Sequence, residues 1–395
     1  MPPNATPSRP RKLRFWALYA GFLAAAGLLM LGLAEVAVRL VVPESAWRFL
    51  VAKDDWQPDA EVGWVNRPGL DVSNRNDGLT MVRFHLNADG LQPAGAIPAR
   101  VPGRTRVMIF GDSATAGRGV PAEERLAAHL ERMLRQSGRD IEVLCAGVQG
   151  HSTDQALLLM RRLLPRYHPD VVIYMLCDND FGANESAVAY GLAKPQFTRT
   201  AAGGLTLALP TAADLERHWN QGSQGWRNHL QHSALYRMIY PGLQKLRFGS
   251  DWRQNNMVGG AKAEDQLAAI AKADWKLFEA LLAAMHTECR AHQATFILTD
   301  HPDVWEVWDT GATPEQRLWM HEKLTATAAA LQFPFCGVVP HFLSVRAEGP
   351  FHLLPRDPHC NGKGYEVIAR CLAAHLQTNG LPAKPAAPAV STTRE

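Results

Sequence analysis

Five short apolar runs recur between residues 106 and 339, and they constrain the fold of this chain more than any other feature. Each run is short and rich in β-branched or aromatic residues, as buried strands are. The runs are VMIF (107–110), IEVLC (141–145), VVIYMLC (171–177), TFILTD (295–300) and FCGVV (335–339). Helical patterns lie between the runs, and long helical patterns cover roughly 264–292, 314–331 and, after the last run, 364–377. Strands alternating with helices predict right-handed βαβ crossovers and a parallel sheet covered on both faces.

The chain divides by composition around this pattern. Residues 105–378 carry the alternating elements and are predicted to form one α/β domain. Within it, residues 182–263 are polar and far longer than a normal connection, so we predict an inserted lid or recognition element. Residues 41–104 are rich in Trp, Pro, Asn and Asp and are predicted to form an irregular cap or stalk. Residues 379–395 are Pro- and Ala-rich without periodicity, which predicts a disordered tail.

A long apolar run stands near the N-terminus. Phe15 to Ala34 are twenty uncharged residues, and as a helix they would span roughly 30 Å, about one hydrocarbon core. Four basic residues precede the run: Arg9, Arg11, Lys12 and Arg14. Because basic residues stay on the cytoplasmic side, we predict a cytoplasmic tail over 1–14 and a transmembrane anchor over 15–40. The rest of the chain, including the predicted cap or stalk, would then be extracytoplasmic.

Two other interpretations of this run remain open. A cleaved signal peptide usually has a shorter apolar region, although Gly32-Leu33-Ala34 could serve as a small-residue cleavage site. A buried core helix would require a long helix that is apolar on every side, next to a basic tail. The anchor interpretation predicts a single-pass membrane protein with its main domain on the extracytoplasmic side.

Charge and cysteine content exclude some classes of protein. Lys and Arg number 41 against 38 Asp and Glu, so the net charge of +3 gives no electrostatic footprint for nucleic acid. Six cysteines are present, and an oxidising compartment would permit disulfides. Their spacing matches no zinc pattern, and most are expected to be small buried hydrophobes. We predict neither a metal site nor a cofactor.

Polar residues follow the first three runs, at the sheet edge where open α/β folds bind ligands. Ser113 lies in FGDSATAG (110–117), where a nucleophile could stand, although a serine here could also simply cap a helix. Gly150 follows the second run and could present its N–H to an oxyanion, or merely form a turn. Asn179 in CDND (177–180) offers an amide donor. A metal-binding Asp178 and Asp180 pair competes with that interpretation.

Near the C-terminus, Asp357 and His359 stand on either side of Pro358 in DPHCNGKGY (357–365). A serine nucleophile needs a base and a carboxylate that orients it. Pro358 biases Asp357 toward extended backbone, in which residues i and i+2 point to one side. Rival groups exist in Asp300 with His301 and in His151 beside Gly150.

The order of these four pieces resembles that of the SGNH (GDSL-like) hydrolases, from about Arg106 to Leu376. The resemblance implies a flavodoxin-like three-layer α/β/α sandwich without a cofactor. It also implies that Ser113, Gly150 and Asn179 donate to the oxyanion. The apolar run, the segments around Val62-Gly63-Trp64 and Arg67-Pro68-Gly69, and HLNADGL (85–91) look like bacterial members with an N-terminal anchor.

Three positions depart from the family pattern. Cys145 stands where the second block usually begins with asparagine, and Cys177 stands where the third usually begins with glycine. Only Pro358 separates the aspartate from the histidine, where two residues are common. This shorter spacing also resembles alginate-type O-acetyltransferases of related fold.

These features predict a serine esterase that cleaves an O-acyl ester through an acyl-enzyme on Ser113, with His359 as base and Asp357 as its partner. The expected substrate is an ester-bearing small molecule, lipid or glycan, with an envelope carbohydrate or lipid as one candidate. The resemblance to anchored bacterial members implies a bacterial inner-membrane protein whose main domain is periplasmic. Two alternatives remain open. One is an O-acyltransferase that passes the acyl group to a polysaccharide hydroxyl, and the other is an anchored binding protein without turnover. The oligomeric state is not predicted.

Overall fold

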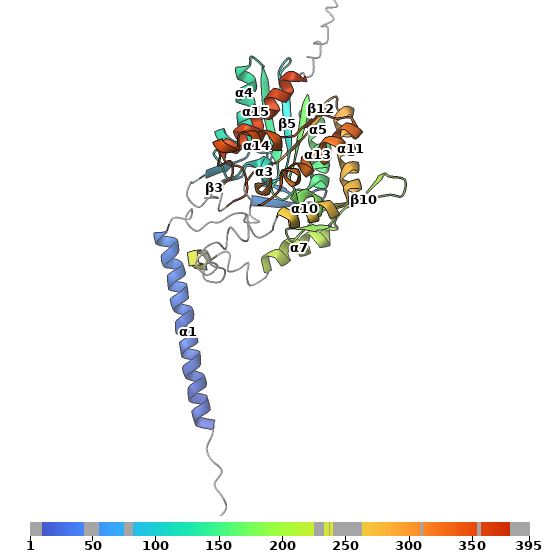
Figure 1. The fold of residues 1–395 in the computed structure, drawn as a ribbon. Helices are drawn as coiled ribbons and strands as arrows, with labels where there is room; N and C mark the ends of the chain where they lie inside the picture. The colour runs from blue at the N-terminus through green and yellow to red at the C-terminus, as the bar shows by residue number, and fades with distance from the viewer. Residues whose placement is uncertain are drawn as a thin grey trace, which may run out of the picture.

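The computed structural model describes the chain from residue 10 to residue 379 with several gaps (Figure 1). The described ranges are 10–42, 55–74, 82–224, 233–236, 238–239, 263–308, 311–353 and 357–379. Most of the predicted tail, residues 380–395, and residues 1–9 of the predicted cytoplasmic tail lie outside these ranges.

A five-stranded parallel sheet forms the centre of the described domain. Its strands coincide with the five apolar runs: β5 (Thr105–Gly111), β6 (Ile141–Gly147), β7 (Val171–Leu176), β12 (Thr295–Asp300) and β13 (Phe335–Cys336). Their order is β13-β12-β7-β5-β6, and every neighbouring pair is parallel. Numbered along the chain, this is the 2-1-3-4-5 order of flavodoxin-like folds. The predicted fold class is confirmed.

Two apolar cores lie on opposite faces of the sheet, because successive side chains of a strand point to opposite sides. Even-numbered residues such as Phe110, Tyr174 and Phe296 belong to one core, and odd-numbered residues such as Ile109 and Ile173 belong to the other. The first core contains α5 (Thr153–Tyr167), α11 (Trp275–Ala291) and α13 (Pro314–Leu331). The second contains α4 (Leu126–Gln136), α14 (Val339–Ser344) and α15 (Gly362–Thr378). Figure 1 shows α4 and α15 side by side, away from α5 and α11.

The helix boundaries differ from the sequence pattern at two places. The predicted 264–292 helix is two helices, α10 (Ala263–Lys272) and α11, because the Asp274 side chain accepts from Leu277 N at 3.0 Å and starts a new helix. The other difference is that α5 continues through Pro165 to Tyr167, although a proline in a helical pattern usually ends the helix. The proline lies in the last turn, where few backbone hydrogen bonds remain to be lost.

Residues 55–104 contribute two short hairpins. They are formed by β1 (Trp56–Asp59) with β2 (Gly63–Asn66) and by β3 (Asp71–Asn74) with β4 (Val82–His85). Trp64 is fully buried, and its Nε1 donates to Gln149 O at 3.0 Å. Asp55 and Arg118 form a buried ion pair at 2.6 Å. These contacts fix the β1–β2 hairpin against the loops at the carboxyl edge of the sheet.

The predicted insertion, residues 182–263, begins within α6 (Asn179–Asn184), and the structure describes its first part and short pieces of the remainder. The first part contains two hairpins and a helix: β8 (Val188–Ala189) with β9 (Leu192–Ala193), β10 (Gln196–Arg199) with β11 (Leu205–Ala208), and α7 (Ala212–Gln224). Lys194 attaches this segment to the domain. Its Nζ lies 2.5 Å from Asp154 Oδ2, and neither side chain is exposed to solvent.

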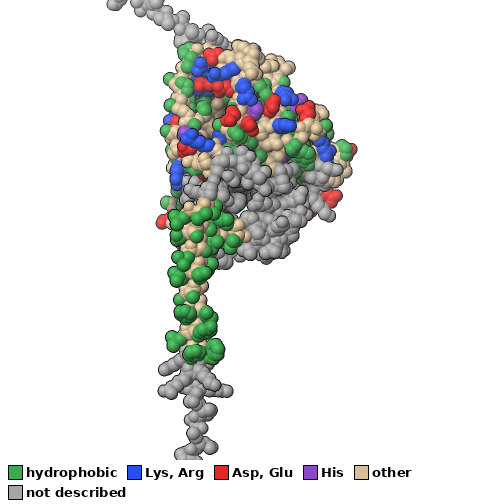
Figure 2. All heavy atoms as spheres, turned by 90° about the vertical axis from the view of Figure 1, so that its left-hand side faces the viewer, with side chains coloured by type: hydrophobic (Ala, Val, Ile, Leu, Met, Phe, Trp, Pro, Cys, Tyr) green, Lys and Arg blue, Asp and Glu red, His purple; other side chains and the backbone are tan. Residues whose placement is uncertain are grey.

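The N-terminal helix α1 (Pro10–Val41) projects away from the domain (Figure 1). Phe15–Val41 is long and apolar enough to cross a membrane, with a mean hydropathy of 2.0, and hydrophobic side chains cover its surface (Figure 2). Near its end, Glu35 accepts hydrogen bonds from Ser233 Oγ, Ala234 N and Leu235 N of the insertion. A helix of this kind is either a membrane span or a signal sequence.

The Lys194–Asp154 pair predicts a stability effect. Lys194→Met would leave the Asp154 carboxylate buried without its cation, which typically costs about 3–5 kcal/mol. Urea unfolding of the full chain in detergent should therefore show a large loss of stability. Arg370→Met, which breaks an exposed pair with Glu366 on α15, is the control and should change little. Equal effects of the two variants would contradict a special role for the buried pair.

Candidate active site

Ser113 is presented by a tight turn at the end of β5. At Gly111, φ is +152°, and a Cβ would lie 2.1 Å from Thr115 Oγ1 and 2.6 Å from Met175 O. Asp112 caps the short helix α3 (Ser113–Ala116), and its Oδ1 accepts from Ala114 N at 2.8 Å. The chain thus passes directly from the strand into a helical turn that begins with Ser113. This point lies between β5 and β7, where the strand order reverses and open sheets bind ligands.

His359 connects Ser113 to Asp357 through hydrogen bonds. Its Nε2 lies 2.7 Å from Ser113 Oγ, and its Nδ1 lies 2.5 Å from Asp357 Oδ1. The same Asp357 oxygen accepts from the backbone N of His359 at 2.8 Å. Asp357 thus binds both the backbone and the ring of His359. The two side chains can meet in this way although only Pro358 separates the two residues.

The carboxylate neighbours of His359 determine its charge. Burial alone would lower the pKa of His359, but Asp357, with smaller contributions from Asp112 and Asp303, raises it to about 9 from 6.5. Burial opposes ionisation of Asp357 as well, yet His359 holds the pKa of Asp357 below its ordinary value. The pair therefore favours an imidazolium beside a carboxylate, as a base that has taken a serine proton requires.

Two of the predicted oxyanion donors face the same space. Asn179 Nδ2 lies 3.3 Å from Asp112 Oδ2 and 3.2 Å from Tyr190 Oη. Gly150 has φ of +75°, and a Cβ there would lie 2.8 Å from the Tyr190 ring. A side chain at position 150 would be strained and obstructed, so glycine suits close backbone approach.

Tyr190 is a candidate functional residue that the sequence reasoning missed. It lies in the two-residue turn between β8 and β9, where its φ is +52° and that of Gly191 is +74°. Such a turn favours Asn or Gly, and a tyrosine in it carries strain. The Tyr190 side chain lies against both Gly150 and Asn179. The only available sequence signal was an aromatic residue before glycine near the start of the insertion.

The rival Asp300 and His301 have other partners. Asp300 Oδ1 accepts from Val338 N at 2.7 Å. His301 is buried, and its Nε2 lies 3.5 Å from Cys360 Sγ. Burial lowers the pKa of His301 to about 4. The structure brings Ser113 to His359. His301 instead contacts Cys360, the residue that follows His359.

The remaining rival groups support the backbone. His151 is buried, its Nε2 lies 2.8 Å from Trp64 O, and burial lowers its pKa to about 4. Asp180 Oδ2 accepts from Tyr174 Oη at 2.8 Å and from Cys177 N at 3.1 Å. Asp180 therefore closes the turn after β7. Its hydrogen bonds give it a structural role that differs from the metal-binding role considered for Asp178 and Asp180 in the sequence.

All six cysteines lie in the described part of the chain and are free thiols. Four are buried, as expected for small hydrophobes, and Cys177 and Cys371 are partly exposed. Cys145, at the position of the first departure, donates from Sγ to Thr115 O at 3.4 Å. It thereby links β6 to the helix that carries Ser113.

A hydroxyl, an imidazole and a carboxylate in series at the switch point of a flavodoxin-like sheet form a site of the serine-hydrolase type. The family comparison agrees. This chain belongs to the GDSL-like lipase/acylhydrolase family, whose model matches residues 109–367. The resemblance seen in the sequence is thus confirmed.

Individual relatives are more distant. An arylesterase of Vibrio mimicus is 31% identical over 75 residues, which are 19% of this chain and 38% of the relative. Among solved structures, TesA is 14% identical, covering 69% of this chain and 99% of its own, with a TM-score of 0.38. A family 3 carbohydrate esterase of Clostridium thermocellum is 13% identical, covering 70% and 96%, also with a TM-score of 0.38.

The raised pKa of His359 predicts the pH dependence of the site. An imidazole accepts a serine proton only when it is neutral, so kcat/KM should rise with pH, with a midpoint well above 6.5 and near 9. Asp112→Asn removes one of the charges that raise this pKa and keeps an oxygen for the helix cap, so the midpoint should move to lower pH. While Asp357 stays ionised, the contribution of His359 to stability should be complete below about pH 6.5 and lost as the pH rises through about 9, and the contribution of Asp357 should be lost at acid pH.

The pH profile of activated-ester hydrolysis measures this midpoint, and denaturant unfolding at each pH measures the linked stability. A midpoint at or below 6.5 in the unmodified chain would contradict the assignment of charge to His359.

Tyr190 predicts an effect on acyl-chain preference. Because its ring fills space beside Gly150 and Asn179, Tyr190→Ala should raise kcat/KM for longer acyl esters relative to acetyl esters by at least about tenfold. Tyr190→Phe keeps the ring and should preserve the original preference. A chain-length series of p-nitrophenyl esters measures both, and an unchanged profile in the alanine variant would remove Tyr190 from the substrate site.

Proposed function

We propose that this chain is a serine esterase that cleaves O-acyl esters through an acyl-enzyme on Ser113. The observation that carries the proposal is the 2.7 Å contact between His359 Nε2 and Ser113 Oγ, continued at 2.5 Å to Asp357. His359 takes the Ser113 proton as Oγ attacks the ester carbonyl. Asp357 holds the ring and stabilises the imidazolium.

The oxyanion of the tetrahedral intermediate is held by the N–H groups of Ser113 and Gly150 and by the Asn179 amide. The role of Asn179 is supported by its contact with Asp112, the residue that directly precedes the proposed nucleophile Ser113. In the free chain the Asn179 amide faces Tyr190 Oη, so a bound oxyanion takes over part of that hydrogen bonding. Collapse of the intermediate expels the alcohol, which receives the proton from His359, and water then releases the acyl group by the same route.

The substrate is proposed to be an ester of an envelope carbohydrate or lipid, reached by a periplasmic domain on an inner-membrane anchor. Two observations support this setting. The apolar part of α1 is exposed around the helix and follows a basic segment. The insertion contacts Glu35 at the end of that helix, so the segment that carries Tyr190 also meets the anchor.

The catalytic assignment is tested by comparing Ser113→Ala, His359→Ala and the double variant. Each single change should lower kcat by at least about 10³-fold, and the double variant should be little worse, because members of one catalytic unit act non-additively. His301→Ala tests the rival base and should cost much less than His359→Ala, because His301 contacts Cys360 and not Ser113.

Initial rates with a short-chain activated ester measure these effects, and a fluorophosphonate probe should label the unmodified chain at Ser113. Near-normal hydrolysis by His359→Ala with loss in His301→Ala would move the base to the loop after β12. Labelling without any turnover of simple esters would favour transfer of the acyl group to a sugar hydroxyl. Neither labelling nor turnover would favour a binding protein.

A further inference from the structure

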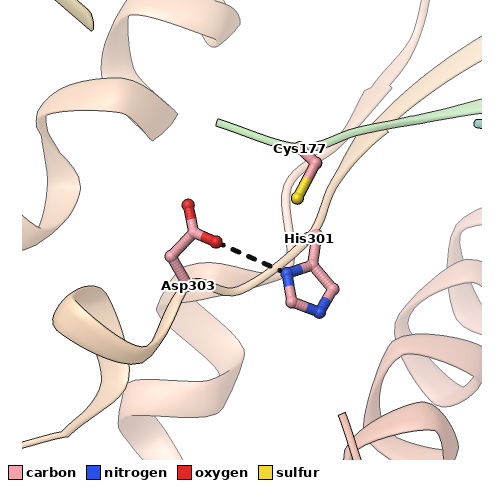
Figure 3. A group of neighbouring side chains, drawn as sticks. All are labelled: Cys177, His301 and Asp303. Carbon is pink, nitrogen blue, oxygen red and sulfur yellow. Dashed lines mark ion pairs between the residues drawn. The ribbon is translucent and has the colours of Figure 1, made fainter. Parts of the chain in front are cut away.

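Three side chains with metal-binding atoms converge beside the catalytic residues. Cys177 follows β7, and His301 and Asp303 follow β12 at the start of α12 (Val304–Val307). The Cys177 sulfur, a His301 ring nitrogen and an Asp303 carboxylate oxygen all lie within 4.8 Å of one another. Figure 3 shows the three side chains directed into the same space from two neighbouring loops.

The polar atoms in this space are not satisfied by the described protein. His301 is 3% exposed, and among the described residues its Nδ1 has no hydrogen-bond partner. Asp303 is 9% exposed, and its Oδ2 likewise has none there. Buried polar groups are normally paired, so the His301 Nδ1 atom, which faces the Asp303 carboxylate without a hydrogen bond to any described residue, points to a missing ligand.

The spacing suits a small tetrahedral cation. His301 Nδ1 and Asp303 Oδ1 are 3.5 Å apart. Two ligands at bond lengths of about 2.0–2.2 Å in a tetrahedron are separated by about 3.4 Å, so this edge already has the required length. Cys177 supplies the third ligand: its sulfur lies within 4.8 Å of the other two donor atoms and would have to approach the cation to form a zinc–sulfur bond of about 2.3 Å. The partly exposed Asp178, whose carboxyl lies within hydrogen-bonding reach of Asp303, or a water is available for the fourth.

We propose that Cys177, His301 and Asp303 bind a zinc-class divalent cation. A thiolate, an imidazole and a carboxylate together are ligands that Zn²⁺ accepts, whereas Mg²⁺ and Ca²⁺ prefer oxygen alone. The surroundings favour positive charge, because the buried Glu306 accepts from Asp303 N at 2.8 Å and the buried Asp300, the last residue of β12, acts electrostatically on Asp303. The cation compensates the negative charge that Cys177 and Asp303 bring into this buried space.

The cation would join two loops that hold site residues. Cys177 is two residues before Asn179, and His301 Nε2 faces the sulfur of Cys360, which follows His359. Binding of the metal therefore links the loop that carries Asn179 to His301, which contacts the residue after the base His359. This consequence for catalysis rests on the proposed function, whereas the binding of the metal does not.

Metal binding to the purified full chain in detergent tests the proposal. After removal of metals with a chelator, the reduced protein should bind one equivalent of Zn²⁺, and Co²⁺ should give a thiolate-to-metal charge-transfer band. Cys177→Ser, His301→Gln and Asp303→Asn should each weaken Zn²⁺ binding at least about tenfold. Cys177→Ser should also abolish the charge-transfer band.

Cys371→Ser, which changes the other partly exposed cysteine, is the matched control and should leave both readouts unchanged. Ser113→Ala should bind Zn²⁺ like the unmodified chain, which separates this proposal from the catalytic one. Circular dichroism identifies any variant that fails to fold. The cobalt spectrum of the unmodified chain tests the proposal even if every variant fails to fold. Absence of the charge-transfer band in that chain, or unchanged Zn²⁺ binding by a folded Cys177→Ser variant, would overturn the proposal.

Discussion

The parallel pairing of β5 with β6 on one side and β7 on the other is the constraint on which the site depends. It brings the carboxyl ends of three strands to one edge, so residues distant in the sequence meet there. The close fit leaves room only for hydrogen at two positions: a Cβ on Gly111 would reach Met175 O of β7, and one on Gly147 would lie 2.6 Å from Ala116 N. Glycine at each strand end therefore allows α3 to sit directly on the sheet.

The sequence predicted this framework because its signals are local. Each apolar run is a buried strand, and the alternation with helices defines the layers without knowledge of any long-range contact. The positions of Ser113 and Asn179 followed from the same rule, since both stand immediately after a strand. Asp357 and His359 could be paired in the sequence because only Pro358 separates them, and the structure shows one carboxylate oxygen binding both the ring and the backbone of His359.

What the sequence did not reveal depends on contacts between distant segments. Tyr190 reaches Gly150 and Asn179 only because a two-residue turn at the start of the insertion folds back over the sheet edge. The grouping of Cys177 with His301 and Asp303 requires β7 and β12 to be neighbours, which spacing along the chain cannot show. Cys177 was recognised as a departure from the family pattern, but its surroundings were not predictable from its immediate neighbours.

The electrostatics of this edge follow from the same packing. His359 carries its raised pKa because Asp357, Asp112 and Asp303 approach it from three different loops, and their combined field outweighs the cost of burial. His301, on the loop behind, is buried too, but its neighbours do not offset that cost, and its pKa is lowered to about 4. Two histidines at one sheet edge are thus driven toward opposite charge states. The high pKa of His359 stabilises the imidazolium that forms once the neutral ring has taken the Ser113 proton, whereas His301 contacts Cys360 instead of Ser113.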